Sequence, residues 1–192
     1  VGDPPTGEGD QEAANSKLTA LLDVVTAVDK AEGSSAETDN VFKNIGSVVN
    51  LTVAAAGGDA DDRGKALASV LATSKNDNAA AALEAAEDLV KDAGGNAEAL
   101  NSVLQHTDKA ASLKTVIDKR KELHGTSSET LDVTDLLKQA ETADTLEKVI
   151  VQIDTLGFEG EQATDIFNNI EDLAVLLDEA DKSAERAKEA AR

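Results

Sequence analysis

The chain has 192 residues, enough to bury the core of one domain, and its hydrophobic content of 41% includes only 2% aromatic residues. The formal net charge of −20 repels nucleic-acid phosphates and anionic lipid head groups, which argues against nucleic-acid binding, and the acidic residues are too dispersed to favour a mimic of DNA. Because the chain has no cysteine, disulfides, thiolate metal sites and cysteine nucleophiles are excluded. Small aliphatic side chains suit long helices that approach one another closely, so we expect an elongated protein.

The N-terminal part predicts a leader followed by a helix. Both prolines and three glycines fall within residues 1–10, which predicts a flexible leader ahead of a single domain over residues 11–192. Apolar residues in the segment 11–32 recur at spacings of three and four, which predicts one inward helical face. The members of this face are Leu18, Leu21, Leu22, Val25 and Val28. Ser34 and Glu37 then form a capping-box pattern for the next helix.

The middle of the chain predicts three further helices. The second helix of the chain stops at Gly57 and Gly58, and its inward residues are Val41, Ile45, Val48 and Thr52. A shorter third helix carries Leu67, Val70 and Leu71. The fourth begins near Ala79 after a turn over residues 74–78 and ends at Gly94 and Gly95.

Two longer helices are predicted next. Asn96 can cap the first, over residues 97–124, which contains no Gly or Pro and would form a rod of roughly 40 Å. After a loop at residues 125–129, the second spans residues 132–156. We find no strand candidate, because the β-branched run from 149 to 153 lies inside a longer helical period.

The last helix shows an uninterrupted heptad seam, in which large aliphatic residues give way to alanine. Its members are Ile166, Ile170, Leu173, Leu177, Ala180, Ala184, Ala187 and Ala191. We expect its first half to lie in a full core and residues 180–192 either to pack closely on one neighbour or to project as a tail. The predicted fold is all-α, an elongated antiparallel bundle of about five to six long amphipathic helices. Regular stripes with caps argue against the alternative, an acidic disordered chain.

One acidic string imitates the start of a calcium-binding loop. It comprises Asp59, Asp61, Asp62 and Gly64, but an EF-hand needs an oxygen ligand at its fifth position and a Glu at its twelfth, where this chain has Arg63 and Val70. We therefore interpret the string as the acidic first turn of a helix, which the helix dipole favours.

The two histidines lie eighteen residues apart, at His106 and His124, and on one helix they would be separated by roughly 27 Å, too far to share a metal. His124 is interpreted as a C-terminal cation together with residues 119–121, which form a solvated last turn rather than an anion-binding patch.

No catalytic, cofactor-binding or metal-binding residues are predicted. The sequence contains no glycine-rich phosphate loop, nucleophile elbow, zinc-binding motif or dinucleotide fingerprint, and its many carboxylates are uninformative without a cleft. Asn50, Leu51 and Thr52 spell a glycosylation acceptor, but a three-residue match inside a predicted helix favours chance. We therefore expect a protein that is not an enzyme.

The composition and three segments resemble the glutamic acid/alanine-rich surface protein of African trypanosomes. The likeness is carried by the run 79–92 (AAAALEAAEDLVKD), the rod 97–124 and the closing segment 181–192 (DKSAERAKEAAR). The resemblance implies an extended bundle similar to that of variant surface glycoproteins, held on the insect-stage cell surface by a C-terminal glycolipid (GPI) anchor that would lie outside this chain. Unlike those glycoproteins, this chain has no disulfides.

The resemblance implies a non-enzymatic coat protein that shields the membrane and mediates contact between parasite and vector. Its partners would be neighbouring copies in the coat and a host or vector factor, with no nucleic acid and no cofactor. The alternative is a surface lipoprotein or adhesin that binds a host protein or a small apolar ligand between its helices, because small residues in a seam can leave a groove.

Overall fold

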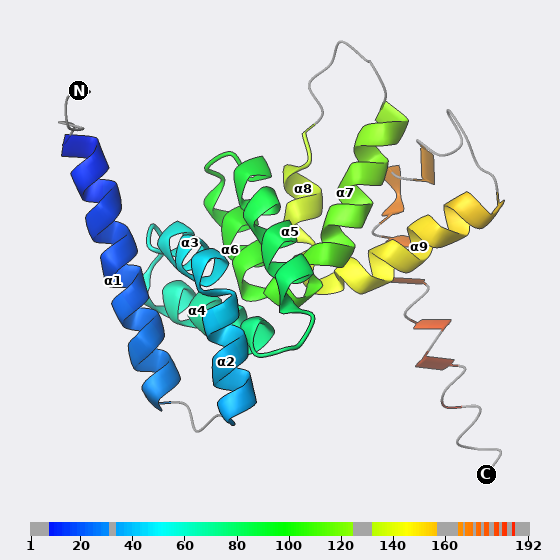
Figure 1. Ribbon diagram of the computed structural model, residues 1–192. Helices are drawn as coiled ribbons and strands as arrows, with labels where there is room; N and C mark the ends of the chain where they lie inside the picture. Colours follow the sequence, from blue (N-terminus) through cyan, green and yellow to red (C-terminus); the bar gives the residue numbers. More distant parts are fainter. Residues whose placement is uncertain are drawn as a thin grey trace, which may run out of the picture.

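The computed structural model describes residues 8–30, 34–124 and 132–156, together with scattered positions between 165 and 186, and all of its regular elements there are helical (Figure 1). The α-helices are α1 (Glu8–Lys30), α2 (Ser35–Lys43), α3 (Ile45–Ala55), α4 (Ala60–Ser74), α5 (Ala79–Asp92), α6 (Ala97–Gln105), α7 (Ala110–His124), α8 (Thr134–Lys138) and α9 (Ala143–Leu156). Two 3-10 turns, Thr107–Lys109 and Ala140–Thr142, follow α6 and α8. The all-α prediction is confirmed. Most of the proposed leader lies outside the described residues, and α1 begins at Glu8.

The predicted small number of long helices is wrong, because three of them are interrupted. The second is divided at Asn44, whose side chain donates to the Asn40 carbonyl oxygen over 2.9 Å. The rod 97–124 leaves helical geometry at His106, with φ of −128°, and the segment 132–156 leaves it at Gln139. Beside the break at His106 the Thr107 hydroxyl donates to the Leu104 carbonyl oxygen over 3.0 Å. Such local side-chain bonding competes with the regular hydrogen bonds of a helix.

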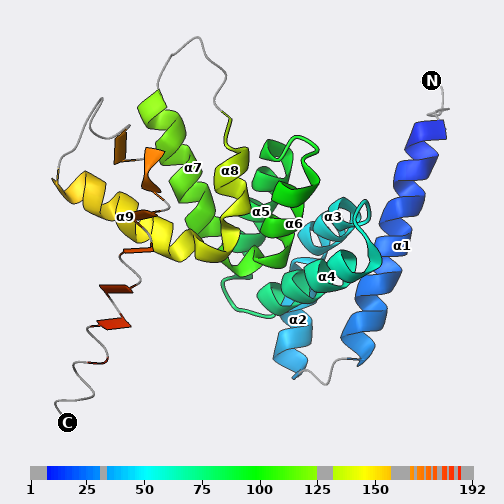
Figure 2. The same ribbon diagram turned by 180° about the vertical axis from the view of Figure 1, so that it is seen from behind.

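The helices form a packed bundle in which they are stacked in two rows. In one row α4 packs on α6 and α6 on α8, and in the other α3 packs on α5, α5 on α7 and α7 on α9. At one end of the second row, α1 packs on α3 (Figures 1 and 2). Contacts of each helix pair with its neighbours are typical of helical-repeat proteins.

Two consecutive helix pairs repeat with an offset of 33 residues. The 3-10 turn and the following helix of the pair α6–α7 begin 33 residues before their counterparts in the pair α8–α9. Five buried residues are identical at this offset, and the pairs are Leu104 and Leu137, Ala110 and Ala143, Leu113 and Leu146, Val116 and Val149, and Ile117 and Ile150. The two pairs therefore bury the same side chains at equivalent positions.

Polar bonds fix the register between successive helices of the stack. The Asn40 side chain donates to the Lys75 carbonyl oxygen over 3.0 Å, and the Thr107 backbone N–H donates to the Ser69 hydroxyl over 3.1 Å. The Ser102 hydroxyl likewise donates to the Lys138 carbonyl oxygen over 2.9 Å. Each bond joins a helix to the C-terminal end of a neighbouring helix or to the turn that follows it, so a one-turn slip of either helix would break the bond.

The C-terminal heptad seam is confirmed only in its first half. Ile170 is buried, and Ile166 and Leu173 pack beside it against a cluster of α7 and α9 that comprises Val116, Leu146, Val149 and Ile150. Ala180 is exposed. Leu177, Ala184, Ala187 and Ala191 lie outside the described residues.

The predicted inward face of α1 is wrong for four of its five residues, whereas the fifth, Val28, is partly buried and packs against the core. Leu18 and Leu22 are 66% and 65% exposed, and Leu21 and Val25 are also exposed. The residues that α1 buries are Ala20 and Val24 instead. Small residues allow the backbone of α1 to approach α3, while the leucines point to solvent.

Candidate functional site

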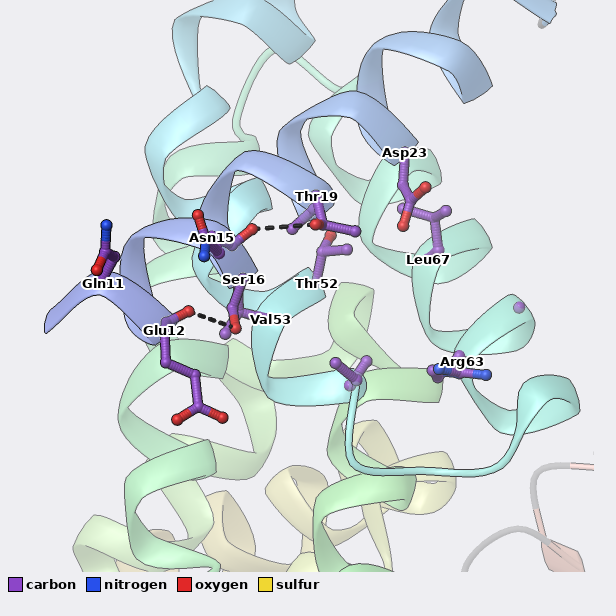
Figure 3. Close-up of a pocket in the computed structure, with 14 residues that line it drawn as sticks. Gln11, Glu12, Asn15, Ser16, Thr19, Asp23, Thr52, Val53, Arg63 and Leu67 are labelled. Carbon is purple, nitrogen blue, oxygen red and sulfur yellow. Dashed lines mark hydrogen bonds between the residues drawn. The ribbon is translucent and has the colours of Figure 1, made fainter. Parts of the chain in front are cut away.

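A groove runs between α1 and the surface formed by α3 and α4, and its volume is about 650 Å³ (Figure 3). One wall is the polar side of α1, and the other is formed by the end of α3 and the first turns of α4. This volume lies within the usual range for ligand sites in proteins. We therefore take the groove as the candidate functional site.

The floor of the groove is made by small and aliphatic residues. They are Ala20, Val53, Ala55, Ala56, Gly64 and Leu67. Gly64 is the most informative of these, because a Cβ atom built on it would meet no other atom within 4 Å. The space above α4 is therefore open, and any larger residue at this position would narrow it.

Three charged residues line the edges of the groove. Glu12 and Asp23 belong to α1 and Arg63 to α4, and all three side chains are exposed. None of the three forms an ion pair within the described part of the chain. In Figure 3, Asp23 and Arg63 lie toward one end of the groove and Glu12 toward the other. Polar groups from Asn15, Ser16, Thr19 and Thr52 complete the lining.

The acidic string at the start of α4 positions this wall. The Asp59 side chain accepts from the backbone N–H groups of Asp61 and Asp62, both over 2.9 Å, and so caps the helix. Asp61 and Asp62 form the acidic first turn that the sequence predicts. These bonds, with that from Asp62 foremost, hold the pKa of Asp59 below its ordinary value.

The carboxylate of Asp62 ties α4 to the next layer of the stack. It accepts from the Asn101 side chain over 2.7 Å and from the Gln105 side chain over 3.2 Å. Lys65 pairs with Asp61 over 2.7 Å. The string therefore caps α4 and holds it in place, and within the described residues no group of three or more acidic, His or Cys side chains is arranged to hold a metal ion.

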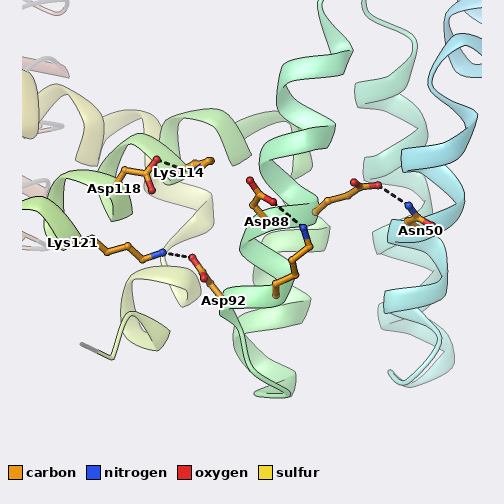
Figure 4. A network of polar contacts seen from close by, with 8 residues as sticks. Asn50, Asp88, Asp92, Lys114, Asp118 and Lys121 are labelled. Atoms are coloured by element: carbon orange, nitrogen blue, oxygen red, sulfur yellow. Dashed lines mark hydrogen bonds and ion pairs between the residues drawn. The ribbon is translucent and has the colours of Figure 1, made fainter. Parts of the chain in front are cut away.

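The other residues singled out in the sequence lie away from the groove. His106 caps the end of α6, and His124 is the last residue of α7. Lys121 pairs with Asp92 of α5 over 2.6 Å (Figure 4). Arg120 donates to the Asn168 side-chain oxygen over 3.3 Å. The basic end of α7 thus bonds to neighbouring elements.

The glycosylation motif is part of α3, and two of its side chains already have partners. Asn50 donates to a carboxylate oxygen of Glu87 over 3.0 Å (Figure 4), and the Thr52 hydroxyl donates to the Val48 carbonyl oxygen over 2.7 Å. Leu51 between them is buried. This arrangement supports the interpretation of the motif as a chance match.

Comparison with known proteins gives no identification. No family model, no curated protein and no solved structure matches this chain. The likeness to the trypanosome surface protein therefore stays a prediction drawn from composition. Within the described residues, no helix is long and apolar enough to cross a membrane.

The groove itself was not predicted from the sequence. The inward face assigned to α1 placed its leucines against the core, which would have closed the space. The available signal was the polar row formed by Glu12, Ser16, Thr19 and Asp23 on the same helix, opposite a helical glycine at position 64.

Proposed function

We propose that this chain is a non-enzymatic protein-binding module, and that the groove between α1 and α4 holds a basic peptide segment bearing aliphatic side chains. The observation that carries the proposal is the groove itself, which combines an apolar floor with carboxylates at its edges that form no ion pair with the described residues. The sequence-based alternative was a surface lipoprotein or adhesin that binds a host protein or a small apolar ligand, and the present proposal shares with it only the binding of another protein.

The chemistry of the groove matches such a segment in three ways. The small residues of the floor leave room for one or two aliphatic side chains of the partner. Glu12 and Asp23 can accept from lysine or arginine side chains, and Arg63 can donate to peptide carbonyl oxygens. The net charge of −20 attracts a cationic partner over distance and raises the rate of encounter.

A fluorescent peptide rich in lysine and leucine tests the proposal by anisotropy. We expect Gly64→Leu to fill the groove and weaken binding at least about tenfold, which corresponds to about 1.4 kcal/mol. Gly46→Leu is the matched control, because Gly46 is also an exposed helical glycine with open space around it and lies outside the groove. Equal affinities of the two variants would show that the peptide binds elsewhere on the acidic surface.

A small apolar ligand is the second candidate for the same groove, since the volume and the apolar floor would suit it. Native mass spectrometry of gently purified protein distinguishes the two. A bound small molecule that is lost in Gly64→Leu and kept in Gly46→Leu would favour this candidate over the peptide.

The coat function implied by the resemblance remains a prediction. Its premise of a few long helices is wrong, because most of the described helices are short and stacked. Labelling of intact cells before and after cleavage of glycolipid anchors would test it independently of the groove.

A further inference from the structure

The outer face of α1 carries an apolar stripe formed by Leu18, Leu21, Leu22 and Val25. In α1 these four side chains are exposed, while Ala20 and Val24 are buried on the side of the helix that packs on the rest of the stack. Figures 1 and 2 show α1 at the end of the stack, with its neighbours on one side only. Terminal helices of repeat proteins usually present a polar outer face, so α1 has the surface of an internal layer.

The charges on α1 argue that this stripe does not bind a membrane. A helix that lies on a lipid surface carries Lys and Arg on its polar face. The polar face of α1 instead contains Glu12, Asn15, Ser16, Thr19 and Asp23, which line the groove. Carboxylates there, on a chain of net charge −20, are repelled by anionic head groups.

The spacing of the stripe is symmetric. Successive members of the stripe are separated by three, one and three residues, so the pattern is the same when the helix is read in either direction. An antiparallel second copy would therefore place Leu18 opposite Val25, with Leu21 and Leu22 of both copies meeting at the two-fold axis. This is the self-complementarity that an isologous interface requires.

Charge also permits this pairing. Between residues 14 and 28 the charged residues of α1 are Lys17 and Asp23, and Asp23 faces the groove. The stripe thus brings no carboxylate to the centre of the contact, although each copy is strongly acidic overall. We propose that two copies of this chain pair antiparallel through the outer faces of α1, which leaves both grooves open.

The pair is a weak one. The exposed parts of the four side chains amount to about two whole aliphatic side chains per copy, which is small beside a standard interface, so we expect a dissociation constant in the micromolar range. Salt strengthens the pairing, because it screens the repulsion between the two acidic copies and leaves apolar contact intact.

Sedimentation equilibrium of the full chain over a range of concentrations, at low and high salt, tests the proposal. We expect a monomer–dimer equilibrium that shifts toward dimer with salt, and at least about tenfold weaker pairing in Leu22→Glu. Val151→Glu, which alters an exposed apolar residue of α9, should dimerise as wild type does. A monomer at every concentration, pairing unaffected by Leu22→Glu, or growth beyond dimers would overturn the proposal.

The absence of native cysteine allows a second test of the geometry. Under oxidising conditions Leu22→Cys should form a disulfide-linked dimer, because both copies of position 22 lie beside the two-fold axis. Leu18→Cys should not, since its two copies would lie roughly 10 Å apart along the helices, beyond disulfide reach. Efficient cross-linking at position 18 would indicate parallel pairing and contradict the proposal.

Discussion

Leu104 of α6 and Leu137 of α8 occupy the same place in two successive layers of the stack, 33 residues apart, and both are completely buried. After each leucine the chain forms a 3-10 turn, and a buried alanine then begins the next helix. The stability of the protein should therefore depend mainly on the contacts between neighbouring layers.

Truncation at these two positions should therefore have similar effects. We expect Leu104→Ala and Leu137→Ala each to lower the free energy of unfolding by about 2–5 kcal/mol, because each leaves a cavity between layers. Urea unfolding followed by circular dichroism measures this. Leu18→Ala, at an exposed position, is the control and should change stability by less than about 0.5 kcal/mol. A cost for Leu104→Ala as small as that of the control would contradict the stacked arrangement.

The bond between Ser69 and Thr107 offers a test of register. We expect Ser69→Ala to cost about 1–3 kcal/mol, because it removes the acceptor for the backbone N–H of a buried residue. Ser16→Ala, which removes only a local bond to the Glu12 carbonyl oxygen on exposed α1, should be close to neutral in the same unfolding experiment. Equal effects of the two substitutions would mean that the bond between layers does not form.

Replacing Gly64, which lines the groove, and Gly46, which lies outside it, by alanine should change the free energy of unfolding by similar amounts. Gly64→Ala and Gly46→Ala both replace exposed helical glycines with no neighbouring atom in the way, so each should raise the free energy of unfolding by up to about 1 kcal/mol. Thermal unfolding gives the comparison. Destabilisation by Gly64→Ala would show that the groove is narrower than the structure has it.

The Asp59 cap should make stability sensitive to acid. Its folded-state pKa lies below the ordinary value of 3.8, so its stabilisation is fully present above that value and is lost as the pH falls through the lower, folded pKa. Asp59→Asn keeps an oxygen acceptor but does not titrate. We expect the stability difference between wild type and Asp59→Asn, measured by urea unfolding, to shrink as the pH is lowered below 3.8. A difference that stays constant there would show that the charged form is not favoured by the fold.

Helix ends were the best-predicted features, because their signals are local. The capping box at Ser34 and Glu37 is present, with bonds of 2.9 and 3.3 Å, and Asn96 caps α6 through the Ala99 N–H. Gly94 and Gly95 end α5 with φ of 57° and 87°, the left-handed region that favours glycine.

The breaks at Asn44, His106 and Gln139 were missed, because none of these residues is a strong helix breaker. The bonds that accompany the first two breaks link Asn44 to Asn40, and Thr107 to Leu104 and to Ser69 of another layer. The repeat itself was readable, since five identical residues recur at one offset.

The orientation of α1 could not be predicted from periodicity. The helix has two apolar faces, and the stripe with the larger side chains, Leu18, Leu21, Leu22 and Val25, looked like the buried one. Which face docks depends on how closely α1 can approach α3, and Ala20 permits that approach. The groove follows from this choice, so it could not be foreseen either.

The most direct test of the proposed function is an NMR titration of the isotope-labelled chain with the lysine- and leucine-rich peptide. The proposal predicts that the largest amide shifts cluster on both walls of the groove, around Ser16 and Asp23 of α1 and around Gly64 and Leu67 of α4, and that Gly64→Leu abolishes them. Shifts that instead follow the exposed carboxylates of α5 and α7, or that persist unchanged in Gly64→Leu, would contradict it.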